Sequence, residues 1–489
     1  MRRRLAAGVA AGVLLTLTLP PLGWWPLGVV GVAVLHHALG GAGWRPRLAV
    51  GVATGVGLYA PGLWWVTEFH SAGWVAVVVL ESWLLAAAVA LVPGRRGGIA
   101  ALVALPAALV VAEAFRGSWP FGGLPLAGVE LGQVDGPLLP VARLGGHLML
   151  VAAVGLAGVG LGQVVGWVAS RRPPPGWPAA AAAVAALVLP VLASVAGTMA
   201  FDGSERGRLA VAAVQGGGPR GLRAAGRDSR PVFDAHVTAS RRVSPGTDVV
   251  IWPEDVVDIE GGPLAGSPEE AESAALAREL GVTLVVGVVE DVPRTRRFRN
   301  AAVVWGPDGR QLDRYEKVHR VPFGEFVPFR SLFEGLADLS AVPRDAISGR
   351  GPGVLDTPSG RLGVVISYEV FFADRARAAA AAGGRLMLVP TNASSFTTSQ
   401  VPAQELAVAR LRAVETGRWA VQAAPTGYSA VVDQRGRVRQ RGPLGDAAVL
   451  EAVVDLRGGR TPAVRLGDSP IAAVALAAMA GSWLLRKET

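Results

Sequence analysis

The chain has 489 residues, a net charge of +9 at pH 7 and no cysteine. Hydrophobic residues make up 51% of it and charged residues 17%, whereas about 25% of a typical soluble domain is charged. This composition excludes a disordered chain, a collagen and a coiled-coil rod. The lack of cysteine excludes disulfides, zinc–thiolate sites, iron–sulfur clusters and a thiol nucleophile.

Eight apolar runs each approach the length of about 20 residues that a helix needs to cross a bilayer. We expect membrane spans near residues 5–20, 23–40, 48–66, 74–93, 99–115, 147–169, 178–200 and 468–485. The first run follows three arginines, as a signal peptide would, but six further runs before residue 201 favour a first transmembrane helix. The sequence therefore predicts a transmembrane domain over residues 1–200, a globular domain over 201–463, and a final transmembrane helix with a cytoplasmic tail over 464–489.

The excess positive charge lies mainly in the apolar ends. Residues 1–200 carry a net +6, residues 201–463 only +2, and residues 464–489 +1. With the N-terminus in the cytoplasm, the inner segments hold eleven arginines and lysines, and the short outer loops hold two, Arg116 and Arg143. This bias places the globular domain on the outer side of the membrane. The charge thus indicates orientation, and we expect no nucleic-acid partner.

The globular domain alternates β-rich runs with helical patterns, which is typical of an α/β fold with layered sheets. Strands are expected at 209–214, 248–252, 282–289, 301–305, 362–367, 386–390, 419–424, 429–433 and 449–454. Helices are expected near 231–242, 268–280, 371–383 and 400–415. Gly306–Gly309 and Gln434–Gly436 have the composition of hairpin turns.

Two segments of this domain carry charged candidates for chemistry. Glu254 follows an apolar strand, and α/β proteins place ligands beyond strand ends; taken alone, it is more typical of an exposed strand-end residue. Lys317 lies in the segment Tyr315–Pro328 and is one of only two lysines, the other being Lys487, in a chain whose remaining cations are arginines. A lone lysine in such a background indicates a site that needs a compact ammonium.

A third segment, Gly363–Val370, is an apolar strand that ends in Ser367, followed two residues later by Glu369. Taken alone, such a serine is usually structural. The six histidines, including His319, show no spacing typical of metal ligands, so we expect no metal.

Together, and in this order after seven spans, the three segments resemble the apolipoprotein N-acyltransferase family, a membrane branch of the nitrilase (carbon–nitrogen hydrolase) superfamily. Tyr315–Pro328 is the most specific part, and Trp252–Glu254 and the helix Gln404–Gly417 support it. The resemblance implies an αββα sandwich inserted between spans seven and eight of a multi-pass protein of the bacterial inner membrane. The sandwich would lie on the extracytoplasmic side, and no cofactor is implied.

The resemblance also implies a set of site residues. Glu254 matches the family's general base, which would take the nucleophile's proton and later that of the incoming amine. Lys317 matches the family's catalytic lysine, which would stabilise the oxyanion. Ser367 stands at the nucleophile, which is a cysteine in the family, and Ser395 stands where the family tends to place an aromatic residue. Supporting roles are implied for three further residues, Glu325, Tyr368 and Glu369.

The family's reaction moves an acyl chain from a phospholipid to the nucleophile, and then to the α-amino group of a diacylglyceryl-cysteine at a lipoprotein's N-terminus. Because a serine hydroxyl is far less acidic than a thiol, it depends on a base to remove its proton. Three hypotheses therefore stay open: a working N-acyltransferase with a serine nucleophile, a degenerate homologue that is a membrane scaffold for an envelope glycosyltransferase, or a membrane-tethered amidase or esterase. We expect a monomer.

Overall fold

The computed structural model describes residues 1–68, 71–93, 99–171, 173–174, 176–218, 229–333, 339, 342–392 and 399–484. The chain divides into two compact units, Met1–Phe201 with Thr461–Thr489, and Asp202–Arg460. Six residues used in the sequence analysis lie outside the described residues: Arg95, Arg96, Arg172, Ser395, Arg486 and Lys487.

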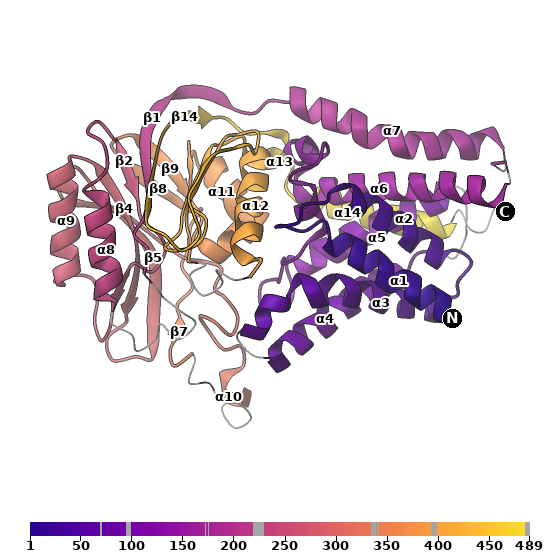
Figure 1. The fold of residues 1–489 in the computed structure, drawn as a ribbon, viewed down its shortest axis with the longest axis horizontal. Helices are drawn as coiled ribbons and strands as arrows, with labels where there is room; N and C mark the ends of the chain where they lie inside the picture. The colour runs from indigo at the N-terminus through magenta and orange to yellow at the C-terminus, as the bar shows by residue number, and fades with distance from the viewer. Residues whose placement is uncertain are drawn as a thin grey trace. The chain divides into compact units, whose positions relative to one another are not determined.

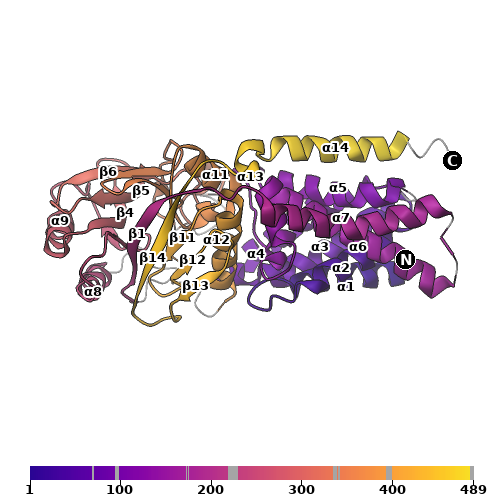
Figure 2. The ribbon, with the colours of Figure 1, turned by 90° about the horizontal axis from the view of Figure 1, so that it is seen from above.

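The first unit is helical, and each of the eight expected spans overlaps one helix (Figures 1 and 2). These helices are α1 (Arg2–Thr16), α2 (Pro26–Leu39), α3 (Trp44–Gly62), α4 (Ser71–Ala90), α5 (Ile99–Arg116), α6 (Ala142–Ser170), α7 (Trp177–Met199) and α14 (Ser469–Leu484). Within the described residues, three helical segments are long and apolar enough to cross a membrane: Ser71–Ala90, Leu139–Ser170 and Trp177–Met199. The apolar helices α2 and α14 are shorter.

The two arginines assigned to outer loops belong to helices, which corrects that assignment. Arg116 is the last residue of α5, is fully buried, and pairs with Glu81 and Glu113. Arg143 lies in α6 and donates to the carbonyl oxygen of Gly197 at 3.1 Å. Arg116 has the carboxylate partners that a buried charge requires, and Arg143 bonds a carbonyl oxygen of α7. Both side chains therefore join helices and contribute nothing to the charge of a loop.

The second unit contains two β-sheets. Among the described residues, the first sheet has the order β14 (Ala448–Gly458), β1 (Ser204–Gln215), β2 (Val249–Ile251), β4 (Thr283–Asp291), β5 (Arg297–Trp305), β6 (Gln311–Glu316), with β3 (Val257–Ile259) beside β4 and β7 (Asp345–Ala346) beside β5. The second has the order β13 (Val438–Arg441), β12 (Ala430–Val432), β11 (Ala420–Ala423), β10 (Met387–Pro390), β9 (Gly360–Val364), β8 (Val354–Thr357). Strands β1, β2 and β4 are parallel, as are β9, β10 and β11.

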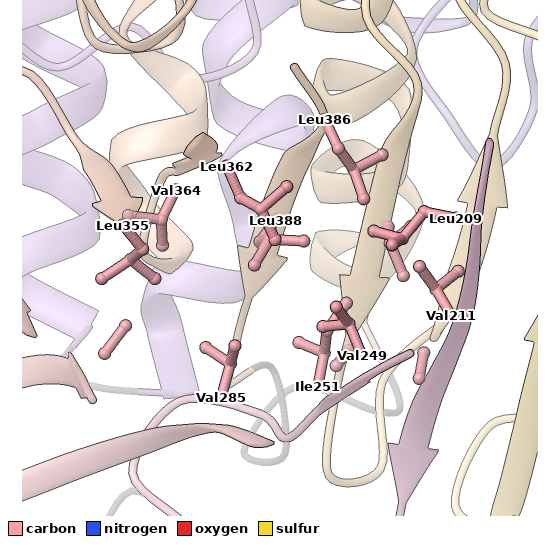
Figure 3. Close-up of a cluster of buried hydrophobic side chains, with 14 of the residues drawn as sticks. Leu209, Val211, Val249, Ile251, Val285, Leu355, Leu362, Val364, Leu386 and Leu388 are labelled. Carbon is pink, nitrogen blue, oxygen red and sulfur yellow. The ribbon is translucent and has the colours of Figure 1, made fainter. Parts of the chain in front are cut away.

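Apolar side chains from both sheets form one buried core between them, and Figure 3 shows Leu362, Leu388 and Ile251 within it. Helices α8 (Arg230–Ser240) and α9 (Pro268–Leu280) pack on the first sheet, while α11 (Ala373–Ala381) and α12 (Val401–Thr416) pack on the second (Figure 1). The unit is therefore an αββα sandwich, as expected. Its parallel strands are buried on both faces, which is why they read as continuous apolar runs in the sequence.

All nine expected strands exist, but one ends earlier than expected. The strand expected over 362–367 ends at Val364, and Ser367 instead opens a short 3₁₀ helix, η4 (Ser367–Phe371). The five strands that were not expected (β3, β6, β7, β8 and β13) are short or polar and carry no apolar run. Both hairpin turns are confirmed, by hydrogen bonds of 2.8 Å from Gly309 N–H to Gly306 and 2.9 Å from Gly436 N–H to Asp433.

Truncation of Leu388 in the inter-sheet core tests this packing. The side chain is fully buried, so Leu388→Ala is expected to lower the free energy of unfolding by about 2–5 kcal/mol. Leu312 on β6 is 42% exposed, and Leu312→Ala should change it by less than about 0.5 kcal/mol. Denaturation of the purified full-length variants measures both, and equal losses would contradict the assignment of the core.

Candidate active site

The main candidate residues follow the ends of three strands. Glu254 comes three residues after β2, Lys317 directly after β6, and Ser367 three residues after β9. Strands β2 and β6 belong to the first sheet and β9 to the second, so both sheets contribute. Glu254 and Lys317 are almost completely buried, at 6% and 2% exposure, whereas Ser367 is half-buried. Ser367 is therefore the member of this group that an incoming molecule reaches most easily.

Lys317 lies between two carboxylates. Its Nζ donates to Oε1 of Glu254 at 2.8 Å and to Oε1 of Glu325 at 2.9 Å. The side-chain amide of Asn300 on β5 donates to the same two oxygens, at 2.8 and 2.9 Å. Asn300 was missed by the sequence analysis, because a single asparagine within a strand carries no local pattern.

The charges of this cluster perturb one another. Burial raises the pKa of Glu254; Lys317 opposes this and Glu325 adds to it. Burial alone would lower the pKa of Lys317, but attraction by Glu254 and Glu325 outweighs it, and the pKa is raised. Lys317 therefore stays an ammonium over the physiological pH range. It is suited to stabilise a negative charge and is not suited to accept a proton.

The backbone around the site is tight and strained. A Cβ at Gly287 on β4 would lie 2.2 Å from the carbonyl oxygen of Pro253 and 2.5 Å from Cα of Glu254, so only glycine lets the chain pass there. Ser367 has φ 47°, and Asp255, next to Glu254, has φ 59°. Left-handed conformations of residues other than glycine cost about 1–3 kcal/mol each and gather at functional sites.

Glu369 fixes the turn that carries Ser367. The side chain is fully buried, and its Oε2 accepts from the backbone N–H of Ile366 at 2.9 Å. Its Oε1 accepts from the Tyr315 hydroxyl at 2.8 Å and from the N–H of Val318, the residue after Lys317, at 2.7 Å. One carboxylate thus ties the turn before Ser367 to the segment that carries Lys317, which sets the spacing between the two.

The immediate neighbours of Ser367 are Thr391 and Glu405. Its Oγ lies 3.5 Å from Oε1 of Glu405, on α12, and 3.5 Å from Oγ1 of Thr391, which itself donates to that carboxylate. Within the described residues, no hydrogen bond joins Ser367 to Glu254 or Lys317. The structure thus gathers Glu254, Lys317 and Glu325 into one cluster and places Ser367 beside Glu405, a residue that the sequence analysis missed.

Electrostatics nevertheless connect the two groups. The pKa of Glu405 is raised to about 7, mainly by burial; the charge of Glu254 contributes to the rise, and that of Lys317 opposes it. Glu405 therefore lies within range of both charges as well as of Ser367. This places all four residues in one electrostatic neighbourhood.

The remaining candidates take structural positions. Tyr368 is buried and packs edge-on against Phe372, with ring centroids 5.1 Å apart. His319 stacks on the same Phe372 ring at 3.9 Å. Over the part of the chain that the structure describes, no group of three or more His, Cys, Asp or Glu residues could hold a metal ion.

Comparisons with known proteins define first the class and then the family. Residues 169–461 match the carbon–nitrogen hydrolase family, and residues 11–160 match the apolipoprotein N-acyltransferase N-terminal domain. The second unit is therefore a carbon–nitrogen hydrolase domain.

Curated relatives extend the similarity to almost the whole chain. The apolipoprotein N-acyltransferase of Mycolicibacterium smegmatis is 32% identical over 97% of this chain and 84% of its own length. That of Geobacter metallireducens is 31% identical over 96% and 92%. Among solved structures, Saccharomyces cerevisiae Nit3, of the nitrilase superfamily, aligns with 52% of this chain and 92% of its own at 24% identity and a TM-score of 0.41. The chain belongs to the apolipoprotein N-acyltransferase family.

Removal of the ammonium tests the charge balance of the cluster. Lys317→Met leaves two carboxylates without their cation, and we expect a loss of about 3–5 kcal/mol in the free energy of unfolding at neutral pH. A buried carboxyl with a raised pKa binds protons more tightly in the folded than in the unfolded state, so the folded state gains stability as the pH falls. The loss should therefore shrink between pH 8 and pH 5. Denaturation of the full-length variant measures it, and an equal loss at both pH values would contradict the argument.

Proposed function

We propose that this chain is an acyltransferase that moves an acyl chain from a phospholipid to the α-amino group of the N-terminal diacylglyceryl-cysteine of lipoproteins. The observation that carries the proposal is the cluster of Lys317 between two carboxylates, in a chain that aligns over nearly its full length with apolipoprotein N-acyltransferases. Two substrates that react in turn at one nucleophile require a covalent acyl-enzyme.

In the first half-reaction, Ser367 Oγ attacks the ester carbonyl of the phospholipid. Lys317, held as an ammonium by Glu254 and Glu325, stabilises the oxyanion that forms, together with a backbone N–H near residue 368. The tetrahedral intermediate then expels the lysophospholipid, whose oxygen receives the proton that Ser367 has lost, and leaves an oxygen ester on Ser367. The half-buried position of Ser367 supports this role, because the ester must reach it.

In the second half-reaction, the lipoprotein amine attacks that ester, the bond between the acyl carbon and Ser367 Oγ breaks, and the proton that the amine loses ends on Ser367 Oγ, which restores the hydroxyl. We assign to Glu254 the role of general base, which accepts the proton that the amine loses. Glu325 and Asn300 fix the positions of the Glu254 and Lys317 side chains. Glu369 fixes the turn that carries Ser367. Tyr368 contributes through its backbone and its aromatic packing.

The serine at position 367 leaves two alternative functions to compare with the transferase. They are a scaffold without transferase activity and a membrane-tethered hydrolase of amides or esters. The lysine weighs against the scaffold. In a domain whose other cations are arginines, Lys317 is buried and held in a cluster of three polar side chains. An apolar side chain would stabilise a scaffold equally well, so a scaffold has no need of this lysine. The hydrolase differs from the transferase only in its acceptor, water in place of an amine.

Mass spectrometry separates these functions. Cells that carry this gene as their only copy should make lipoproteins with a third acyl chain on the N-terminus, and purified protein incubated with phospholipid should carry an acyl mass on the peptide that contains Ser367. Ser367→Ala is the control and should lose both. Unchanged lipoproteins would contradict the transferase; an acyl mass on Ser367 that water alone removes would then support the hydrolase.

We further propose that the chain is a multi-pass protein of the bacterial inner membrane, with about eight spans, the domain boundaries given above, and its globular domain on the outer side. The positive-inside bias supports this orientation. The chain acts as a monomer in this proposal.

The orientation is testable because the chain lacks cysteine. Arg435→Cys lies in an exposed turn of the globular unit and Arg45→Cys at the exposed start of α3. In intact spheroplasts, a membrane-impermeant maleimide should label Arg435→Cys and leave Arg45→Cys unlabelled until the membrane is permeabilised. The opposite pattern would overturn the topology.

A further inference from the structure

We propose that Glu405 is a catalytic residue of this site: its carboxylate takes the hydroxyl proton of Ser367 when the serine attacks the acyl donor. The inference rests on the proposed acyl-enzyme and assigns the proton of its first half-reaction to a group other than Glu254. It concerns this chain's serine, since a thiol does not need the same help.

The contacts of the two carboxylates favour Glu405 over Glu254 as the partner of Ser367. Oε1 of Glu405 lies 3.5 Å from Ser367 Oγ, and among the described residues it is the one carboxylate within hydrogen-bond range of that hydroxyl. Oε1 of Glu254 already accepts from Lys317 and from Asn300, both at 2.8 Å. Hydrogen bonds between catalytic groups are often long before the substrate binds and tighten in the complex.

The surroundings of Glu405 are those of a reactive group. The residue is 4% exposed, and its Oε2 has no hydrogen-bond partner within the described structure. Its Oε1 contacts two hydroxyls, those of Thr391 and Ser367, and no cation lies within ion-pair distance in the described parts of the chain. A buried carboxylate with an unbonded oxygen and no nearby cation lowers the stability of the fold. Its presence therefore indicates a function other than stability.

The structure of α12 does not need Glu405. Arg412, seven residues further along the helix, donates to the carbonyl oxygens of Val370 at 3.0 Å and Phe371 at 3.2 Å, and it pairs with Glu415. These bonds already attach α12 to the short helix that carries Ser367. Glu405 is therefore not needed to attach α12 to that short helix, and it places a proton acceptor beside Ser367.

The step balances with no further reactant. As Ser367 Oγ forms its bond to the ester carbonyl carbon, the O–H proton passes to Glu405 and the carbonyl becomes an oxyanion beside Lys317. When the intermediate collapses, the bond to the lysophospholipid oxygen breaks, and Glu405 returns its proton to that oxygen. Thr391 keeps the carboxylate in place through its hydroxyl.

The charges that face Glu405 suit it to this exchange. Burial raises its pKa to about 7, with Glu254 raising it and Lys317 lowering it from the neighbouring strand ends. A group that both accepts and returns a proton works best when its pKa lies near the working pH. The carboxylate form, which is the base, becomes populated as the pH rises through 7.

The test is the pre-steady-state burst of p-nitrophenol from p-nitrophenyl decanoate, measured on the full-length protein in detergent. Glu405→Gln keeps the shape of the side chain and removes the base, so the acylation rate should fall about 100-fold or more. The increase of the rate with pH through 7 should disappear as well. Glu279→Gln, an exposed glutamate on α9, is the control and should leave rate and profile unchanged.

The nucleophile supplies the second arm of the test. In a Ser367→Cys background the nucleophile is a thiol, which is far more acidic than a hydroxyl and needs the base less, so Glu405→Gln should cost less than about tenfold there. An equal loss in both backgrounds, or an unchanged burst in the serine background, would overturn the assignment to Glu405. A wild-type chain that gives neither a burst nor an acyl mass on Ser367 would instead contradict the acyl-enzyme, and with it the proposed function.

Discussion

The structure of the site depends on the burial of one ammonium group, that of Lys317. Lys317 is 2% exposed, and the removal of such a charge from water costs several kcal/mol unless good partners offset it. Glu254 and Glu325 supply the opposite charge, and Asn300 satisfies the same two oxygens. The loop that carries Glu325, strand β5 with Asn300, and the segments that follow β2 and β6 must therefore form together. The outcome is a fixed positive charge in a site whose proposed nucleophile, Ser367, is half-buried.

The second constraint joins the two sheets. Ser367 follows a strand of one sheet and Lys317 a strand of the other, so their spacing depends on the packed core between the sheets. Glu369 makes this spacing specific, because its two oxygens bind the backbone on both sides of that junction. The strained φ of Ser367 persists because these bonds overdetermine the turn. In the proposed mechanism, the packing of the two sheets therefore sets the catalytic geometry.

Those parts of the fold and site that leave a local pattern could be predicted from the sequence. Buried parallel strands appear as apolar runs, and the lone lysine stands out against arginine. Asn300 and Glu405 leave no such pattern, since their partners lie 46 and 38 residues away and only folding brings them together. The end of β9 at Val364 was also unpredictable, because Val365 and Ile366 continue the apolar run while the turn is imposed by Glu369. The helix Gln404–Gly417 was noticed only as a whole, and nothing in its sequence distinguishes Glu405 from its neighbours.

A neutral serine at position 367 suits the negative charge of the neighbouring Glu405. The site holds three buried or half-buried carboxylates, Glu254, Glu325 and Glu405, around one ammonium. A thiolate at position 367 would add a further negative charge beside Glu405, and two like charges 4 Å apart repel by about 4 kcal/mol at an effective dielectric constant of 20. A neutral hydroxyl avoids that repulsion and can donate to the carboxylate. In the proposed mechanism, a serine nucleophile suits this set of charges, because the carboxylate that would repel a thiolate is the one that accepts the proton of the weakly acidic hydroxyl.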